Sequence, residues 1–366
     1  MGASLSGRER VLVRLPSWLG DFVMSEPLVR ALDSTLERGR MTIVARAAHL
    51  ELLEGRFRHA RRVPVEREGR SARSSWRGHD VAFLCTGSFR SAWTAWRAGI
   101  ARRVGFARDG RGWLLTDALT PALERGGTPL GLGRHGGGRR HLPRPLERSL
   151  AELAGSIGVF VRDLRPRIEL EERWLAAARA RRAGLDLAPD EPYLLANVGA
   201  RPGSAKGVPS RLWRAVLGEL ARRTELPLLL VGGPGEEGAV AGAYPGLSGV
   251  RALLDPPAAL PELAALCAEA ELVLTADSGP RHVARAVGAA VVSVAGPTDP
   301  RHTAGARRRE ELVRTLVACG PCHRELCPLY GAERHACMTE IVPERVVAAA
   351  LGLLARSPSD TIPAPR

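Results

Sequence analysis

A carboxylate that could act as a general base lies in a short motif near the start of the chain. Pro16-Ser17-Trp18-Leu19-Gly20-Asp21 follows an apolar run that ends at Leu15. The glycine lets the backbone approach a ligand closely, and a carboxylate can take a proton from an attacking hydroxyl group. Asp21 is therefore the candidate catalytic base. The alternative is that Asp21 only caps the N-terminus of a helix.

A second polar turn has the composition of an anion site. It reads Thr275-Ala276-Asp277-Ser278-Gly279-Pro280-Arg281-His282, lies after an apolar run and leads into a predicted helix. Backbone N–H groups at a helix start bind phosphate oxygens, so Ser278 and Gly279 are candidate diphosphate ligands, with Asp277 facing sugar hydroxyls. The alternative is an ordinary helix capped by Asp277 or Ser278. Gly296-Pro297-Thr298 ends the next apolar run and is expected to line the same rim.

Lys206 is the only lysine among the 53 basic residues of types Lys and Arg. It lies in the Gly-rich segment 199–209, after a predicted strand, which suits phosphate contact although the P-loop spacing is absent. A lysine is a compact point charge that arginine cannot replace at every phosphate site. Chance survival of one lysine is the alternative.

Another predicted strand ends in a Gly-rich turn with two carboxylates, Gly232-Gly233-Pro234-Gly235-Glu236-Glu237. Acidic residues at such positions bind ribose hydroxyls in nucleotide-binding folds. A solvated surface turn is the equal alternative.

Four of the six cysteines fall within nineteen residues, as Cys319-x2-Cys322-x4-Cys327-x9-Cys337. The Cys-x2-Cys start suits a zinc or iron–sulfur site, with His323 and His335 as further ligands, but the later spacing matches no standard zinc finger. Free thiols are an equal alternative, and disulfide or redox chemistry is a third that a cytoplasmic location disfavours. The four cysteines are candidate ligands of a structural zinc or iron ion.

Apolar runs alternate with helical patterns along the chain, which predicts an α/β fold with parallel strands. The first half is predicted to contain strands at 10–15, 41–45 and 80–84 and helices at 24–38 and 146–157. The second half is predicted to contain strands at 193–198, 227–231, 272–275 and 290–295 and helices at 210–224, 260–270, 281–287 and 343–355. Two open parallel sheets place their ligands at the carboxyl ends of the strands, in a cleft between the halves.

Segment 126–145 is rich in Gly, Arg and Pro and is predicted to be a mobile loop. It contains a formal G-x-G-x-x-G at 131–136, but no strand precedes it, so a dinucleotide site is not expected there. The predicted domains are 1–175 and 190–342, and the Ser- and Pro-rich tail 357–366 is predicted to be disordered.

The formal charge of +14 favours anionic partners, such as nucleic acid, an anionic membrane surface or phosphorylated substrates. The basic residues are spread along the chain and aromatic residues make up only 4%, which argues against nucleic acid. An arginine-rich coding bias explains most of the charge. The sequence contains no run of about 18 apolar residues, so no transmembrane helix is expected. No signal peptide is recognised either. A cytoplasmic protein is therefore expected.

Together these motifs resemble those of the ADP-heptose lipopolysaccharide heptosyltransferases (glycosyltransferase family 9), particularly the second enzyme of the inner core. Residues 16–21 resemble the family's P-S-W-[VL]-G-D, whereas 277–282 and 296–298 resemble its D-S-G-x-x-H and G-P-T. Three further family motifs occur in order. They are S-F-[RK]-S-A at Ser88-Phe89-Arg90-Ser91-Ala92, A-G-I at Ala98-Gly99-Ile100 and R-x-G at Arg103-Val104-Gly105. The Cys-rich segment is also similar to one in many members. The resemblance runs from about residue 10 to 352 in the same order.

This resemblance implies a GT-B fold, with two Rossmann-like parallel-sheet domains facing a central cleft and the final helix, 343–356, packing on the N-terminal domain. It implies inverting, metal-independent transfer of L-glycero-D-manno-heptose from ADP-heptose to heptosyl-Kdo-lipid A of the inner core. No metal-binding Asp-x-Asp motif contradicts this. Asp21 becomes the base, and the implied donor-side residues are Lys206, Glu236, Asp277, Ser278, Gly279, His282, Gly296 and Thr298. The acceptor-side candidates are Ser17, Gly20, Arg90, Arg103 and Arg108.

The chain departs from the family pattern on the nucleotide side. Val198-Gly199-Ala200 stands where members often have Pro-Gly-Ala, and Lys206-Gly207-Val208-Pro209 lacks the tryptophan of Lys-x-Trp-Pro. These departures concern packing around the nucleotide and leave the lysine itself in place.

The expected partners are ADP-heptose and a lipid A-core acceptor at the inner membrane surface, without nucleic acid and with no cofactor required for catalysis. The expected location is cytoplasmic, with peripheral attachment to the cytoplasmic face of the inner membrane as a further option. Three alternatives stay open. They are a GT-B transferase with another nucleotide sugar or acceptor, a GT-B sugar-nucleotide epimerase that needs no acceptor, and a non-enzymatic anion-binding protein.

Overall fold

The computed structural model describes residues 4–66, 70–121, 142–199, 203–244, 247–303 and 309–356. The chain divides into two compact units, residues 1–166 with 301–306 and residues 167–300 with 307–366. The Gly- and Arg-rich stretch 126–140 and the tail 357–366 lie outside the described residues. Among the described helices, none has the length and apolar character needed to cross a membrane.

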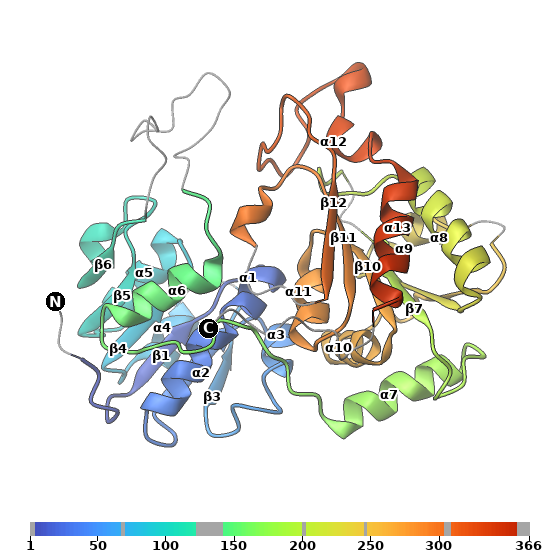
Figure 1. Ribbon diagram of the computed structural model, residues 1–366. Helices are drawn as coiled ribbons and strands as arrows, with labels where there is room; N and C mark the ends of the chain where they lie inside the picture. The colour runs from blue at the N-terminus through green and yellow to red at the C-terminus, as the bar shows by residue number, and fades with distance from the viewer. Residues whose placement is uncertain are drawn as a thin grey trace. The chain divides into compact units, whose positions relative to one another are not determined.

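The first unit is built on a six-stranded parallel sheet with the order β3-β2-β1-β4-β5-β6 (Figure 1). Its strands are β1 (Val11–Arg14), β2 (Met41–Ala45), β3 (Arg61–Pro64), β4 (Val81–Leu84), β5 (Arg102–Phe106) and β6 (Asp117–Leu119). Its helices are α1 (Leu19–Met24), α2 (Glu26–Thr35), α3 (Ala47–Glu51), α4 (Arg70–Trp76), α5 (Phe89–Arg97) and α6 (Leu146–Gly155). The strand order changes direction between β1 and β4, and open sheets of this kind bind ligands beside that point.

The second unit repeats this plan with the order β12-β11-β10-β7-β8-β9. Its strands are β7 (Leu194–Asn197), β8 (Leu228–Val231), β9 (Val250–Leu253), β10 (Leu272–Ala276), β11 (Val291–Ala295) and β12 (Glu310–Arg314). Its helices are α7 (Glu172–Ala183), α8 (Ser210–Thr224), α9 (Glu237–Ala241), α10 (Leu260–Glu269), α11 (Gly279–Ala286), α12 (Ala336–Thr339) and α13 (Pro343–Leu354). Here the order changes direction between β7 and β10. The central strands are buried because helices cover both faces of the sheet.

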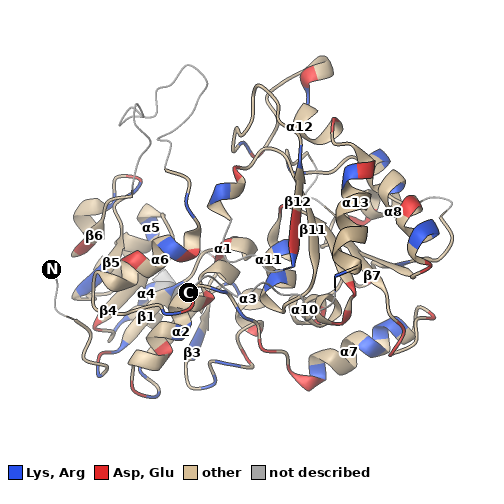
Figure 2. Cartoon of the chain, viewed as in Figure 1, with Lys and Arg blue, Asp and Glu red and all other residues tan. Residues whose placement is uncertain are grey.

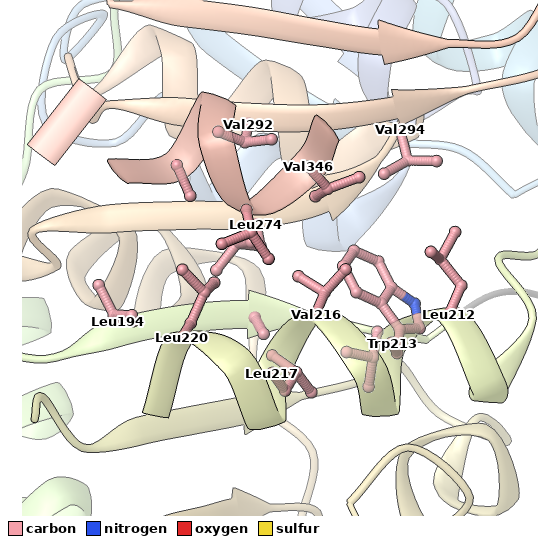
Figure 3. Packing of buried hydrophobic residues seen from close by; sticks show 14 of the residues in the cluster. Leu194, Leu212, Trp213, Val216, Leu217, Leu220, Leu274, Val292, Val294 and Val346 are labelled. Atoms are coloured by element: carbon pink, nitrogen blue, oxygen red, sulfur yellow. The ribbon is translucent and has the colours of Figure 1, made fainter. Parts of the chain in front are cut away.

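The core of the second unit shows how the helical spacing produces the packing. The buried residues of α8 recur three or four positions apart and so share one face, which lies against the sheet (Figure 3). That face consists of Leu212, Trp213, Val216, Leu217 and Leu220. It packs with Leu194, Leu274 and Val292 of the strands. Each such aliphatic side chain contributes roughly 1.5–3 kcal/mol when fully buried.

The final helix, α13, belongs to this same core. Its apolar stripe, with Val346 and Ala350 fully buried, is completed by α8 and by strands β10 to β12. The described helix is thus part of the second unit, and its expected packing on the N-terminal domain stays a prediction. A stripe three or four residues apart indicates that a helix is covered, but it does not say by which domain.

Other differences from the predicted elements have local causes. The helix predicted at 24–38 begins at Glu26, because α1 ends at Met24 and Pro27 occupies the first turn of α2. Strand β3 was not predicted, since it lies at the sheet edge and has no continuous apolar run. Helix α7 lies in the second unit, where Trp174 packs in the core, so the units meet at residue 166 rather than between 175 and 190.

Candidate functional site

The loop between β1 and α1 carries the candidate base. Helix α1 has Trp18 as its N-cap, in an extended conformation, so Asp21 lies inside the first turn rather than at the cap. The structure therefore does not support the alternative that Asp21 is only a capping residue. The Asp21 side chain is half-buried, and its carbonyl oxygen accepts a 2.7 Å hydrogen bond from the Ser25 hydroxyl. A carboxylate in the first turn is stabilised by the helix dipole.

Two buried polar residues support this loop, and sequence reasoning missed both. Arg14 is 4% exposed, and its guanidinium donates to the Leu15 carbonyl and, at 3.3 Å, to the Ser17 hydroxyl. The His49 ring lies 4.8 Å from the Phe22 ring of α1. Burial lowers the pKa of His49 to about 4, and the charge of Arg46 adds to the shift, so this ring is neutral at pH 7. An arginine inside an apolar strand was the signal that could have revealed Arg14.

The acceptor-side arginines take different positions. Arg90, on α5, and Arg108, after β5, are exposed near the carboxyl ends of β4 and β5, at the same sheet edge as Ser17. Arg103 is instead engaged by the protein: its guanidinium donates to the carbonyls of Leu114 and Ile100, both at 2.6 Å. Arg103 therefore holds the backbone, and the structure does not place it as a free anion ligand. Gly20 is buried within α1.

Arg111 is a further buried arginine that the sequence did not reveal. It connects the two segments that carry the exposed Arg90 and Arg108. It has no exposed surface, and it donates to the Phe106 carbonyl at 3.0 Å and to the Ser88 carbonyl at 3.1 Å. Burial lowers its pKa to about 10. Arg111 thus ties the start of α5 to the end of β5.

In the second unit, the turn after β10 is held by a buried ion network. Asp277, 4% exposed, accepts hydrogen bonds from Arg281 at 2.5 Å and from the Thr298 hydroxyl. Burial opposes ionisation of Asp277, but the charges of Arg281 and Lys206 outweigh it and lower the pKa to about 2. Arg281 also pairs with Glu310 of β12, which lies 3.3 Å from Arg285.

This network changes the expected role of Asp277. Its two carboxylate oxygens are each held by a protein partner, Arg281 and Thr298, so the predicted contact with sugar hydroxyls is not what the geometry favours. Asp277 instead joins the turn after β10 to the Gly296-Pro297-Thr298 turn after β11 and to Arg281 of α11. The network partners Arg281 and Glu310 were missed, although an arginine four residues after an aspartate, just inside a helix start, was a visible signal.

The start of α11 provides the expected anion-binding feature in part. The Ser278 N–H donates to the Ala276 carbonyl at 2.8 Å, so that amide is used inside the turn. Gly279 is the first residue of the helix, and Ser278 makes no side-chain cap. The helix dipole places positive potential there. His282 is buried, and burial together with Arg281 and Arg285 lowers its pKa to about 3, so it is neutral at pH 7.

Lys206 lies close to this turn. Its charge lowers the pKa values of both Asp277 and His282. Its own loop is anchored at Ala205, whose N–H donates to the Glu325 carbonyl at 2.8 Å, and by a bridge between Ser204 and Leu326. Lys206 and the turn after β10 therefore interact electrostatically, and their joint role at one anion site stays a prediction. Residues 200–202 of the loop lie outside the described part of the chain.

Glu236 lies where the loops after β7 and β8 approach each other. Its Oε2 accepts a 2.7 Å hydrogen bond from the Gly233 N–H. A Cβ atom at Gly199 would overlap this carboxylate, so a larger residue there would displace the Glu236 side chain from its present position. Glu236 is thus fixed at the same sheet edge as Lys206, beside the point where the strand order changes direction.

Cys337, one of the four clustered cysteines, lies against the Gly296 turn. A Cβ atom at Gly296 would overlap Met338 and come within 2.9 Å of the Cys337 sulfur, so the turn rests directly on α12. Burial raises the pKa of the Cys337 thiol to about 11, and the neighbouring Cys322, Cys319 and Cys327 add to this. Within the described ranges, no three His, Cys, Asp or Glu side chains are arranged to hold a metal ion. The predicted structural metal at these cysteines does not fit this arrangement, and we derive no step from one.

Comparison with known proteins agrees with this geometry. The model of "Glycosyltransferase family 9 (heptosyltransferase)" matches residues 142–332, more than half of the chain. Lipooligosaccharide heptosyltransferase 2 of Campylobacter jejuni is 35% identical over 88 residues, 24% of this chain and 27% of the relative. The chain thus matches about a quarter of that relative's length. The alignment with lipopolysaccharide heptosyltransferase 2 of Escherichia coli is 23% identical and covers 92% of this chain and 96% of the relative.

Two solved structures have a similar fold. E. coli ADP-heptose lipopolysaccharide heptosyltransferase II superposes with a TM-score of 0.70 at 24% identity, over 94% of this chain and 98% of that chain. E. coli heptosyltransferase WaaC with ADP-2-deoxy-2-fluoro heptose gives 0.60 at 19% identity, over 84% and 93%. The predicted GT-B class, with two Rossmann-like parallel sheets, is confirmed. With two such sheets, the motifs at their carboxyl edges and a family match over most of the second unit, the chain belongs to glycosyltransferase family 9, the heptosyltransferases.

Proposed function

We propose that this glycosyltransferase transfers L-glycero-D-manno-heptose from ADP-heptose to the lipopolysaccharide inner core, with inversion at the transferred carbon. The family match and the heptosyltransferase 2 relatives support a heptose donor and an inner-core acceptor. The structural neighbour with ADP-2-deoxy-2-fluoro heptose supports an ADP-linked sugar.

The observation that carries this proposal is the positive region at the carboxyl edge of the second sheet. Lys206 acts on Asp277 and His282 of the turn after β10, while Gly279 opens α11 in that same turn. Asp277 and His282 are both buried. The charge of Asp277 is balanced by Arg281 and His282 is neutral, so neither repels a bound anion. A diphosphate fits this charge pattern, and Glu236 is placed to accept from ribose hydroxyls.

The proposed reaction is a single displacement at the anomeric carbon of the heptose. Asp21 takes the proton of the acceptor hydroxyl while its oxygen forms the new glycosidic bond. The bond from the anomeric carbon to the diphosphate oxygen breaks, and its electron pair leaves with ADP. Lys206 and the Gly279 N–H stabilise the charge that grows on this leaving group. These groups need no metal ion to do so.

The proposed acceptor is heptosyl-Kdo-lipid A at the cytoplasmic face of the inner membrane, where the enzyme works as a cytoplasmic, peripherally attached protein. The exposed Arg90 and Arg108, near the carboxyl edge of the first sheet, suit the anionic groups of such an acceptor. Ser17 and Gly20 lie in the loop and helix that carry Asp21 and are proposed to shape the acceptor side.

The test is a transfer assay with ADP-heptose and heptosyl-Kdo-lipid A, comparing the unchanged chain with Asp21→Asn. We expect product from the unchanged chain, detected by mass spectrometry, and a kcat about 10²–10⁴-fold lower in the variant. ADP binding, measured by calorimetry, should be the same in both proteins because Asp21 is assigned to the acceptor side.

Two results would overturn the proposal. Full transfer by Asp21→Asn would remove the base assignment. Turnover of ADP-heptose without acceptor, giving an epimerised nucleotide sugar, would establish the epimerase alternative instead.

A further inference from the structure

Four exposed aromatic side chains cluster on the first unit. Phe89, Trp93 and Trp96 lie on α5, and Trp113 lies in the 3₁₀ turn Gly112–Leu114. They are 41%, 38%, 44% and 66% exposed, respectively. We call these four residues the aromatic patch. Three of the chain's seven tryptophans are in it, which is a strong concentration for a surface.

The side chains of the aromatic patch contact one another rather than the core. The Trp93 ring centroid lies 4.9 Å from that of Trp96, 6.2 Å from that of Phe89 and 6.5 Å from that of Trp113. Phe89, Trp93 and Trp96 recur four and three residues apart, so they share one stripe of α5. The core side of the helix is formed by Ala92 and Ala95, which are fully buried.

Packing therefore does not explain this stripe. The small alanines already bring α5 close to the sheet, and the aromatic rings project on the other side. Phe89, Arg90 and Trp93 line a hollow of about 360 Å³ there. Large apolar side chains that stay exposed as a group mark a surface that contacts something else.

The charge on helix α5, which carries three of the four rings, has one sign, whereas the loop before Trp113 carries Arg108, Asp109 and Arg111. Helix α5 reads Phe-Arg-Ser-Ala-Trp-Thr-Ala-Trp-Arg and contains no acidic residue. Arg90 and Arg97 are exposed and lie three or four residues from Trp93, on the same side of the helix. Among the described residues, neither guanidinium forms an ion pair. The surface thus offers aromatic rings and positive charge together.

We propose that the aromatic patch docks the chain on an anionic lipid bilayer, with its rings in the headgroup region and Arg90 and Arg97 against lipid phosphates. Tryptophan is enriched at membrane–water interfaces because its ring is apolar and its N–H stays hydrated. Basic side chains near an anionic leaflet each strengthen binding roughly fivefold. A protein partner would need acidic groups placed to match Arg90 and Arg97, whereas an anionic bilayer suits both the aromatic rings and the excess of positive charge on α5.

This inference extends the proposed function, whose acceptor is a lipid, and rests on it only for the identity of that acceptor. Docking itself needs no transfer. A bilayer held at α5 would bring the acceptor's anionic headgroup to the first unit, at whose sheet edge Arg90 and Arg108 are exposed.

The experiment uses the full chain and vesicles of phosphatidylethanolamine with phosphatidylglycerol, compared with phosphatidylcholine alone. The test variant is Trp96→Gln with Trp113→Gln, which are two of the more exposed rings and are not assigned to catalysis or substrate binding. The matched control is Phe160→Gln, because Phe160 is a 78% exposed aromatic of the same unit outside the aromatic patch. Circular dichroism melting checks that all three proteins fold alike.

We expect the unchanged chain and Phe160→Gln to bind the anionic vesicles, more weakly at high salt, and the double variant to bind at least tenfold more weakly. Transfer to a water-soluble, delipidated acceptor should stay within twofold in the double variant, while transfer to acceptor in vesicles should fall. The unchanged chain could bind vesicles but transfer no heptose to the soluble acceptor. That result would contradict the proposed function and leave the docking proposal standing.

Three outcomes would overturn the docking. The unchanged chain could ignore anionic vesicles, or the double variant could bind them as well as the unchanged chain does. Alternatively, light scattering could show a dimer that the double substitution dissociates, in which case a second copy covers the aromatic patch.

Discussion

The carboxyl edges of the two sheets use charge in opposite ways. In the second unit, the site charges are buried and paired with one another, as Asp277 is with Arg281 and Arg281 is with Glu310. In the first unit, the partly buried Arg103 and the buried Arg111 donate to backbone carbonyls, and the arginines that remain for a ligand are exposed. Figure 2 shows that acidic and basic residues otherwise occur throughout both units.

The difference indicates how much each edge is organised before a ligand arrives. The diphosphate of the proposed donor presents the same atoms in every turnover, so a fixed array of hydrogen-bond donors would stabilise its leaving charge without rearrangement. Exposed arginines on a helix and a loop are less constrained and can follow a large lipid headgroup. A buried network also makes the donor edge costly to disturb.

The largest expected effect comes from breaking the buried network. Asp277→Ala leaves Arg281 with one carboxylate partner fewer in a fully buried position, and we expect the free energy of unfolding to fall by about 3–5 kcal/mol. Urea unfolding followed by circular dichroism measures this. The matched control is Asp33→Ala, an exposed aspartate on helix α2 of the first unit, which should change stability by less than about 0.5 kcal/mol. Equal losses in the two variants would contradict the contrast between the edges.

Removing the single lysine should affect the donor edge without unfolding it. We expect Lys206→Ala to lower kcat/KM for ADP-heptose by about 10²-fold, because one preorganised donor to the leaving group is lost. Lys206→Arg should recover part of this, since charge returns without the compact ammonium geometry. Steady-state kinetics at saturating acceptor give the measurement. Unchanged kinetics in Lys206→Ala would remove this residue from the site.

The first unit contains an arginine that holds backbone carbonyls, Arg103, and an exposed one, Arg108. Replacing each by alanine should affect different properties of the protein. Arg103→Ala unties several backbone carbonyls, and we expect about 1–3 kcal/mol lower stability. Arg108→Ala should leave stability within about 0.5 kcal/mol but raise KM for the acceptor, because its side chain is exposed. Thermal melting and acceptor titrations together decide this. A stable Arg103→Ala protein with a raised acceptor KM would return Arg103 to the acceptor site.

The smallest expected effect is on pH dependence. Burial lowers the pKa values of His49 and His282, to about 4 and about 3, below the value of about 6.5 in the unfolded chain. The unfolded state therefore binds more protons below pH 6.5, and stability is full above that pH and declines as pH falls toward the folded pKa values. Each ring should cost about 1 kcal/mol at pH 5.5 relative to pH 7.5. His49→Gln should make the decline shallower in urea titrations at the two pH values, and an unchanged slope would contradict a neutral buried His49.

Much of the site could be predicted because each candidate residue closely follows a strand in the sequence. Asp21, Lys206 and the 277–282 turn each follow an apolar strand, and parallel strands bring their carboxyl ends to one sheet edge. The interactions within those edges could not be predicted. The pairing of Asp277 with Thr298 spans 21 residues, and that of Arg281 with Glu310 spans 29. Spacing alone does not show which buried charges meet.

The amino-acid sequence by itself determined the alternating elements, the two parallel sheets and the position of each motif at a strand end, because hydrophobic periodicity and turn residues act over a few neighbours. Only the tertiary structure decided that Asp277 pairs with Arg281 and that Arg103 donates to backbone carbonyls. It also decided that α13 packs in the second unit and that four aromatic rings stay on the surface. Burial and pairing depend on contacts between distant segments, and these form only when the chain has folded.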